Sequence, residues 1–164
     1  MRSEALFQEY TDSHRPHVIA VVGEIIDACR DGERGYALAS TDVDEPWLKR
    51  LFWQYSHQRA QFAGALEEQL GRLGARVEAK PTVGGWIHRK WLELRSTLDH
   101  RAAIGVLLEC ERGENAALAK YEHALASPLP RALQEMLLSQ LGEIRDAHDR
   151  LDRMRGRSLS VTSV

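Results

Sequence analysis

Two glutamates stand in nearly the same sequence setting, and both fall within stretches that otherwise predict helix. Glu33 lies in CRDGERGY at 29–36, and Glu114 lies in CERGENAA at 110–117. Each follows a glycine, a residue that costs about 1 kcal/mol relative to alanine inside a helix. A glutamate on a packed helix face also needs a cation or hydrogen-bond donors, because burying an unpaired charge is unfavourable. These two positions are therefore the first candidates for chemistry in the chain.

Apolar residues recur at three- and four-residue steps through most of the chain, which predicts helices. We expect helices over about 17–40, from Pro46 to Gly74, from Asp99 onwards and from Pro130 onwards. Proline and glycine mark the breaks between these segments, and no segment shows a convincing strand pattern. The sequence therefore predicts an all-α four-helix bundle.

The two halves of the chain repeat each other. Aligning the two glutamate phrases lays Cys29 on Cys110 and Glu33 on Glu114, and the helices that follow align more loosely. We therefore expect two repeated helical hairpins joined by a helical crossover, within a breaker and amphipathic segment at 76–98. In a bundle of this kind equivalent helix positions meet near the centre, so the two glutamates would be neighbours.

Composition and charge are those of an ordinary globular protein. The 164 residues are 43% hydrophobic and 28% charged, with a net charge of -2, and this length suits a single domain over 1–157. Such a charge gives no general attraction to nucleic acid or anionic membranes, and the apolar runs are too short to span a bilayer. We therefore expect a soluble cytoplasmic protein.

Residues 158–164 lack apolar periodicity and predict a mobile tail.

Four phrases in order along the chain, DGERGY, QRAQFAGAL, GWIHRKWLELRS and LLECERGENAAL, resemble a family of small uncharacterised bacterial proteins. That family is a domain of unknown function with a ferritin-like four-helix bundle, and the resemblance spans about 17–155. It implies the ferritin-like fold and, through ferritin-like relatives, a stress-related role. It brings no established substrate or reaction.

Ferritin-like metalloproteins suggest what a metal site would need here. They hold iron or manganese with one inward glutamate on each of two helices and a Glu-x-x-His pair on each of the other two. By this resemblance Glu33 and Glu114 match the lone glutamates, but the chain contains no Glu-x-x-His. A metal-binding oxidase or iron-handling protein is therefore the alternative interpretation. Besides the two glutamates, its ligands would come from Gln58, Gln61, Glu143 and Asp146.

Arg59 interrupts the apolar stripe of the second helix between Tyr55 and Phe62. Arginine is the side chain best suited to bridge carboxylates in a dry site. Our leading hypothesis is that its guanidinium lies between Glu33 and Glu114 and occupies the place of the metal ions. The protein would then be a non-catalytic bundle with a degenerate metal centre and no cofactor.

Two further features bear on partners and redox chemistry. Trp86 and Trp91 make the crossover amphipathic, so it covers the bundle or, alternatively, presents a dimer surface. We expect a homo-oligomer, most simply a dimer, with no nucleic-acid or membrane partner. Cys29 and Cys110 are expected to be buried reduced thiols, with a redox-sensing pair as the alternative.

Overall fold

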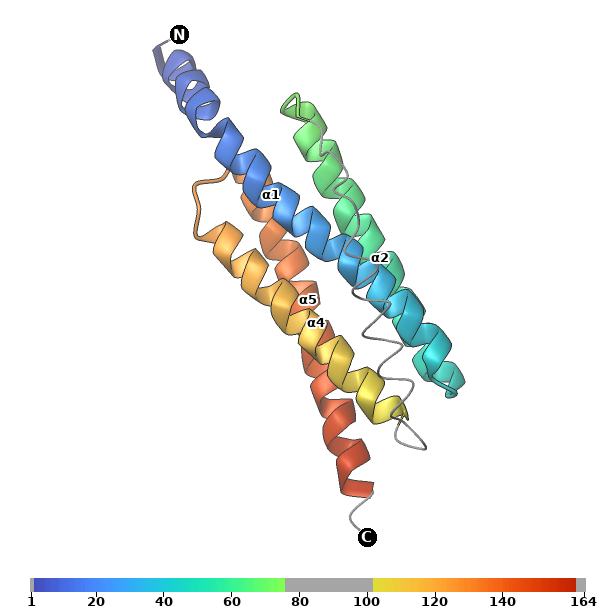
Figure 1. The fold of residues 1–164 in the computed structure, drawn as a ribbon. Helices are drawn as coiled ribbons and strands as arrows, with labels where there is room; N and C mark the ends of the chain where they lie inside the picture. The colour runs from blue at the N-terminus through green and yellow to red at the C-terminus, as the bar shows by residue number, and fades with distance from the viewer. Residues whose placement is uncertain (1, 76–101, 162–164) are drawn as a thin grey trace.

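The computed structural model describes residues 2–75 and 102–161, with side chains over 14–75 and 103–157. Within these residues the chain forms four helices and no strand, which confirms the all-α prediction. The helices are α1 (Arg2–Asp42), α2 (Pro46–Arg72), α4 (Ala102–Leu125) and α5 (Arg131–Val161). Antiparallel neighbours pack together as α1 with α2 and as α4 with α5, and α1 also packs against α4 (Figure 1). None of these described helices has the length and apolarity needed to cross a membrane.

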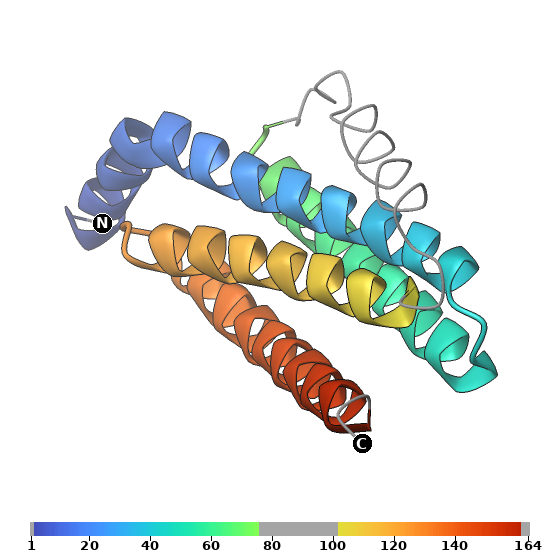
Figure 2. The same cartoon turned by 60° about the horizontal axis from the view of Figure 1, so that its bottom comes forward.

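The first helix is longer than the sequence predicts. We expected it over 17–40, whereas α1 runs from Arg2 to Asp42 and contains Pro16. A proline inside a helix removes one backbone hydrogen bond and kinks the helix rather than always ending it. The N-terminal part of α1 bends away from the rest of the helix (Figure 2). The helix therefore continues through a proline that lies outside the predicted range.

The other boundaries follow proline and glycine chemistry. Pro46 occupies the first turn of α2, directly after the N-cap residue Glu45, where its missing N–H does no harm. After α2 the chain turns at Gly74, whose φ of 70° is the left-handed conformation that glycine adopts freely. Pro130 directly precedes α5. These three residues stop and start the helices as predicted.

The C-terminal segment contains more helix than the sequence predicts. The helix α5 continues to Val161, so the segment 158–164 that predicted an irregular tail is helical up to that residue. The crossover at 76–98 and Asp99, where the third helix is predicted to begin, lie outside the described residues.

The core consists of two apolar clusters, each built from all four described helices. One includes Ile25 of α1, and the other includes Leu151 of α5. The guanidinium carbon of Arg59 lies 5.4 Å from the ring centroid of Phe62 in the first cluster and 6.0 Å from that of Tyr36 in the second. A charged side chain thus stands where the two halves of the core meet.

Candidate functional site

The centre of the bundle holds a buried ion pair between α2 and α4. The Nη2 atom of Arg59 donates to both carboxylate oxygens of Glu114, each at 2.8 Å. The two residues are only 1% and 2% exposed. Burial alone would lower the pKa of Arg59, but the Glu114 carboxylate and Tyr36 raise it overall. The guanidinium therefore stays charged, as an arginine beside a carboxylate does.

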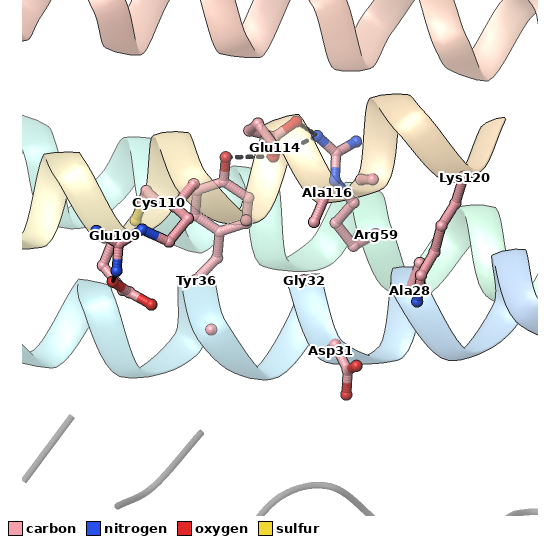
Figure 3. Close-up of a pocket in the computed structure, with 14 residues that line it drawn as sticks. Ala28, Asp31, Gly32, Tyr36, Arg59, Glu109, Cys110, Glu114, Ala116 and Lys120 are labelled. Carbon is pink, nitrogen blue, oxygen red and sulfur yellow. Dashed lines mark hydrogen bonds and ion pairs between the residues drawn. The ribbon is translucent and has the colours of Figure 1, made fainter. Parts of the chain in front are cut away.

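Tyr36 of α1 completes this centre. Its hydroxyl donates to Oε1 of Glu114 at 2.5 Å, and Figure 3 shows Tyr36 and Arg59 pointing toward Glu114 from two different helices. Burial and the adjacent carboxylate raise the pKa of Tyr36 well above its usual value. The phenol is thus a permanent hydrogen-bond donor, and three helices are linked through one carboxylate.

The network extends from the ion pair to α5 through Gln58. The Nη1 atom of Arg59 donates to Oε1 of Gln58 at 3.0 Å, and Nε2 of Gln58 donates to Oε2 of Glu143 at 2.7 Å. The second helices of the two halves align with Leu48 on Leu133, an offset of 85 residues, and Gln58 then corresponds to Glu143. Two equivalent positions of the repeat therefore contact each other directly.

Gly32 makes room for the arginine stem. A Cβ placed on Gly32 would lie 3.2 Å from Cγ and 3.4 Å from Cδ of Arg59, which is tighter than ordinary packing. The equivalent glycine, Gly113, has open space where its Cβ would stand. Only the first of the two repeated glycines therefore serves a close approach in the described structure.

Glu33 lies outside the central ion pair, which corrects the predicted Glu33–Arg59–Glu114 arrangement. Its carboxylate accepts a hydrogen bond from Arg30 at 3.1 Å, and the same arginine pairs with Glu67 of α2 at 2.9 Å. The Glu33 side chain is 33% exposed. Successive residues are rotated by about 100° around the helix axis. Because Gly32 faces Arg59, the next residue, Glu33, is directed toward the partly exposed edge of the α1–α2 hairpin.

The remaining residues of the alternative metal set are not gathered around Glu114. Gln61, Glu143 and Asp146 are exposed, and Glu143 is bonded to Gln58. Among the residues whose side chains the structure describes, no three histidine, cysteine, aspartate or glutamate side chains are grouped so that they could hold a metal ion. The predicted interface residues Trp86 and Trp91 fall outside the described residues.

Both cysteines are buried and reduced, and one belongs to a second polar group in the core. Cys29 Sγ lies 3.2 Å from the hydroxyl of Tyr121, which itself donates to Oε1 of Gln140 at 2.7 Å. Since the tyrosine has one proton to donate, the thiol is the donor in the first contact. Burial raises the pKa of Cys29 and, more strongly, that of Cys110. Both thiols are therefore protonated at neutral pH.

Sequence reasoning did not assign Tyr36, Tyr121 or Gln140 to the polar centre. The two tyrosines look like ordinary members of an apolar stripe, and Gln140 looks like a surface residue. One signal was available for Tyr36, because it stands one helical turn after Gly32 and so shares its face. A phenol on the face that meets Arg59 is a candidate hydrogen-bond donor.

Comparison with known proteins places the chain in a family. No curated protein matches it. The family described as Domain of unknown function (DUF2383) matches residues 17–127, a range that contains Tyr36, Arg59 and Glu114. This match covers more than half of the chain, and it confirms the predicted relation to a domain family of unknown function. The chain belongs to the DUF2383 family.

Proposed function

We propose that the protein is a non-catalytic, ferritin-like helical bundle that works without a metal cofactor. The single observation that carries this proposal is the engagement of both Glu114 oxygens by Arg59, with Tyr36 bonded to one of them. In ferritin-like metalloproteins inward carboxylates hold the metal ions. Here the corresponding carboxylate holds a guanidinium, so protein charge takes the place of the metal.

Electrostatics support this interpretation. A metal ion beside Glu114 would also lie beside the guanidinium, whose positive charge offsets the attraction of the carboxylate. At a separation of about 4 Å and an effective dielectric constant of about 20, two unit charges interact by about 4 kcal/mol. For a divalent cation the repulsion from Arg59 is about twice that value under the same conditions. Binding would therefore require Arg59 to leave a site in which it is almost fully buried.

The ferritin-like part of the proposal draws support from the repeat. The antiparallel pairs α1–α2 and α4–α5 correspond to the two halves of the sequence alignment. The contact between Gln58 and Glu143 joins equivalent positions of these halves, as expected near a pseudo-twofold axis. A crossover joining two hairpins is the connection that ferritin-like bundles use.

A titration with Fe(II) under anaerobic conditions, followed by admission of oxygen, tests the proposal. We expect no saturable heat of binding and no oxygen consumption above the rate of free Fe(II), and the same result with Mn(II). The control is the Glu114→Gln variant, which lacks the carboxylate. Stoichiometric binding by the wild type that is lost in this variant would establish the alternative, a metal-binding oxidase or iron-handling protein.

We also propose that the bundle self-associates, most simply as a dimer. Large apolar side chains on the described surface support this, above all Trp53 of α2, which is 57% exposed and stacks on His57 with ring centroids 4.4 Å apart. Exposed aromatic residues often anchor protein interfaces. Sedimentation equilibrium of the wild type and of Trp53→Glu tests this, and a monomer at all concentrations in both would contradict it. A cytoplasmic location, expected from composition and charge, and a stress-related role, implied by the ferritin-like resemblance alone, remain part of the proposal.

A further inference from the structure

A cavity of about 210 Å³ lies between α1 and α4, next to the central ion pair. Its floor is formed by Arg59, Glu114 and Tyr36, and Cys110 stands in its wall (Figure 3). For comparison, an engineered apolar cavity of about 150 Å³ in another protein binds benzene. The space is thus large enough for a small organic molecule.

Small residues on both helices create this space. Gly35 and Gly113 line it from opposite helices, and a Cβ on either glycine would meet no atom within 4 Å. Ala28 and Ala116 line it as well. Alanine would be the more stable residue at each glycine by about 1 kcal/mol. Packing within the described structure therefore gives no reason for either glycine, whereas an occupant of the cavity would.

The floor offers one hydrogen-bond donor that has no partner. Nη1 and Nη2 of Arg59 are engaged by Gln58 and Glu114, but Nε has no acceptor among the described residues. This atom lies beside Gly32, 3.7 Å from the point where a Cβ of that residue would stand. Nε is not one of the fully buried unpaired atoms of the described residues, so it is accessible from the cavity. A ligand with an accepting oxygen would satisfy it.

The charges around the cavity balance each other. In the floor the guanidinium neutralises Glu114. At the rim Glu109 pairs with Arg112 at 3.0 Å, and Asp31 is offset by Arg34 at 3.7 Å. Lys120 also lines the rim and attracts Asp31. The lining therefore carries three acidic and three basic side chains, and with no net charge the site favours an uncharged molecule over an ion.

We propose that this cavity is a binding site for a compact, uncharged and mainly apolar molecule of about the size of a substituted benzene. The ligand carries one carbonyl or hydroxyl oxygen that accepts a hydrogen bond from Arg59 Nε, while its apolar body lies against the glycine and alanine walls. This site goes beyond the proposed function, because it concerns a ligand of the bundle. It rests on the proposed function in one respect, the placement of Arg59 beside Glu114, and metal binding that displaced Arg59 would be detected separately in the Fe(II) titration.

Acetophenone is a suitable probe, because it combines an aromatic ring with one carbonyl oxygen. We expect saturable shifts of the Arg59 Nε–H resonance and of amides around Gly32 and Gly113 when acetophenone is titrated into the full chain in NMR experiments. Ethylbenzene has nearly the same shape without the oxygen and should bind about tenfold more weakly. Benzoate, which is charged, should also bind at least about tenfold more weakly.

Two variants separate filling of the cavity from a general effect of mutation. In Gly113→Leu the new side chain occupies the cavity, so acetophenone binding should fall at least about tenfold. In the control Gly64→Leu the change is on the exposed face of α2, where a Cβ meets no atom within 4 Å, and binding should be unchanged. Thermal melts check that both variants fold.

Three results would overturn the proposal. The first is the absence of saturable shifts in the wild type, and the second is equal acetophenone binding by Gly113→Leu and the wild type. The third is equal or tighter binding of ethylbenzene or benzoate, which would contradict the assigned ligand class and the role of Arg59 Nε.

Discussion

Removing one partner of the Arg59–Glu114 pair should cost far more than removing both. Arg59→Met leaves the Glu114 carboxylate, 2% exposed, with only the Tyr36 hydroxyl, and Glu114→Met leaves the guanidinium without its carboxylate. An uncompensated buried charge costs about 3–5 kcal/mol. Each single variant should therefore lose that amount of unfolding free energy. For a domain of this size, this corresponds to a fall in Tm of about 6–20 °C.

The double variant Arg59→Met, Glu114→Met should behave quite differently. If the two residues did not interact, their losses would add to about 6–10 kcal/mol. Replacing a buried ion pair by well-packed apolar groups is often neutral or stabilising. The remaining cost is the Tyr36 hydroxyl, which loses its acceptor and should contribute about 1–3 kcal/mol. We therefore expect a loss of about 1–3 kcal/mol, and a coupling energy of at least about 3 kcal/mol.

Urea unfolding followed by circular dichroism measures all four proteins of this cycle. The matched control is Arg30→Met, which removes another arginine between α1 and α2, but one that is 36% exposed and paired with a Glu67 side chain 41% exposed. Exposed pairs contribute about 0–1 kcal/mol, so this variant should lose no more than that. Single losses at Arg59 as small as at Arg30, or a double variant as unstable as the sum of the singles, would refute the reasoning.

Three further predictions concern other features of the structure. Burial raises the pKa of Cys29 and Cys110, so the folded state keeps protons that unfolded thiols release above about pH 8.5. Stability should fall as pH rises beyond that value, by up to about 1.4 kcal/mol per unit for each thiol. In urea titrations Cys110→Ala should make the decline shallower, and identical slopes would contradict this. Gly113→Ala should raise the free energy of unfolding by about 0.5–1 kcal/mol. Gly32→Ala should not raise it, because the new Cβ would crowd the buried side chain of Arg59. Calorimetry showing that Gly32→Ala is the more stable variant would contradict both predictions. Arg131→Ala should change the free energy of unfolding by less than about 0.5 kcal/mol, because the Arg131 side chain, paired with Glu135, is 90% exposed. A larger change measured by calorimetry would contradict this prediction.

Much of the fold could be predicted from local chemistry. Pro46, Gly74 and Pro130 act through backbone conformations that depend only on neighbouring residues, so the helix boundaries near them were predictable. The start of α1 was not, because a proline such as Pro16 can either end a helix or kink it. Which of these occurs depends on packing elsewhere in the bundle.

The candidate site was predictable in part. Arg59 stood out because it is a charged residue in an apolar stripe, and a carboxylate partner was the natural expectation. Which of the two repeated glutamates pairs with it depends on the rotation of α1, which directs Gly32 rather than Glu33 toward the arginine. A sequence repeat predicts equivalent backbone positions, but it does not predict that both side chains have equivalent partners. The contribution of Tyr36 likewise depends on contacts between helices distant in sequence.

The central claim is that protein charge, not metal, fills the centre of the bundle. Elemental analysis tests it most directly, with protein produced in medium supplemented with iron and manganese and purified without chelator. The wild type and Glu114→Gln are compared side by side. We predict far less than one metal ion per chain in both proteins. Near-stoichiometric iron or manganese in the wild type, lost in Glu114→Gln, would contradict the claim.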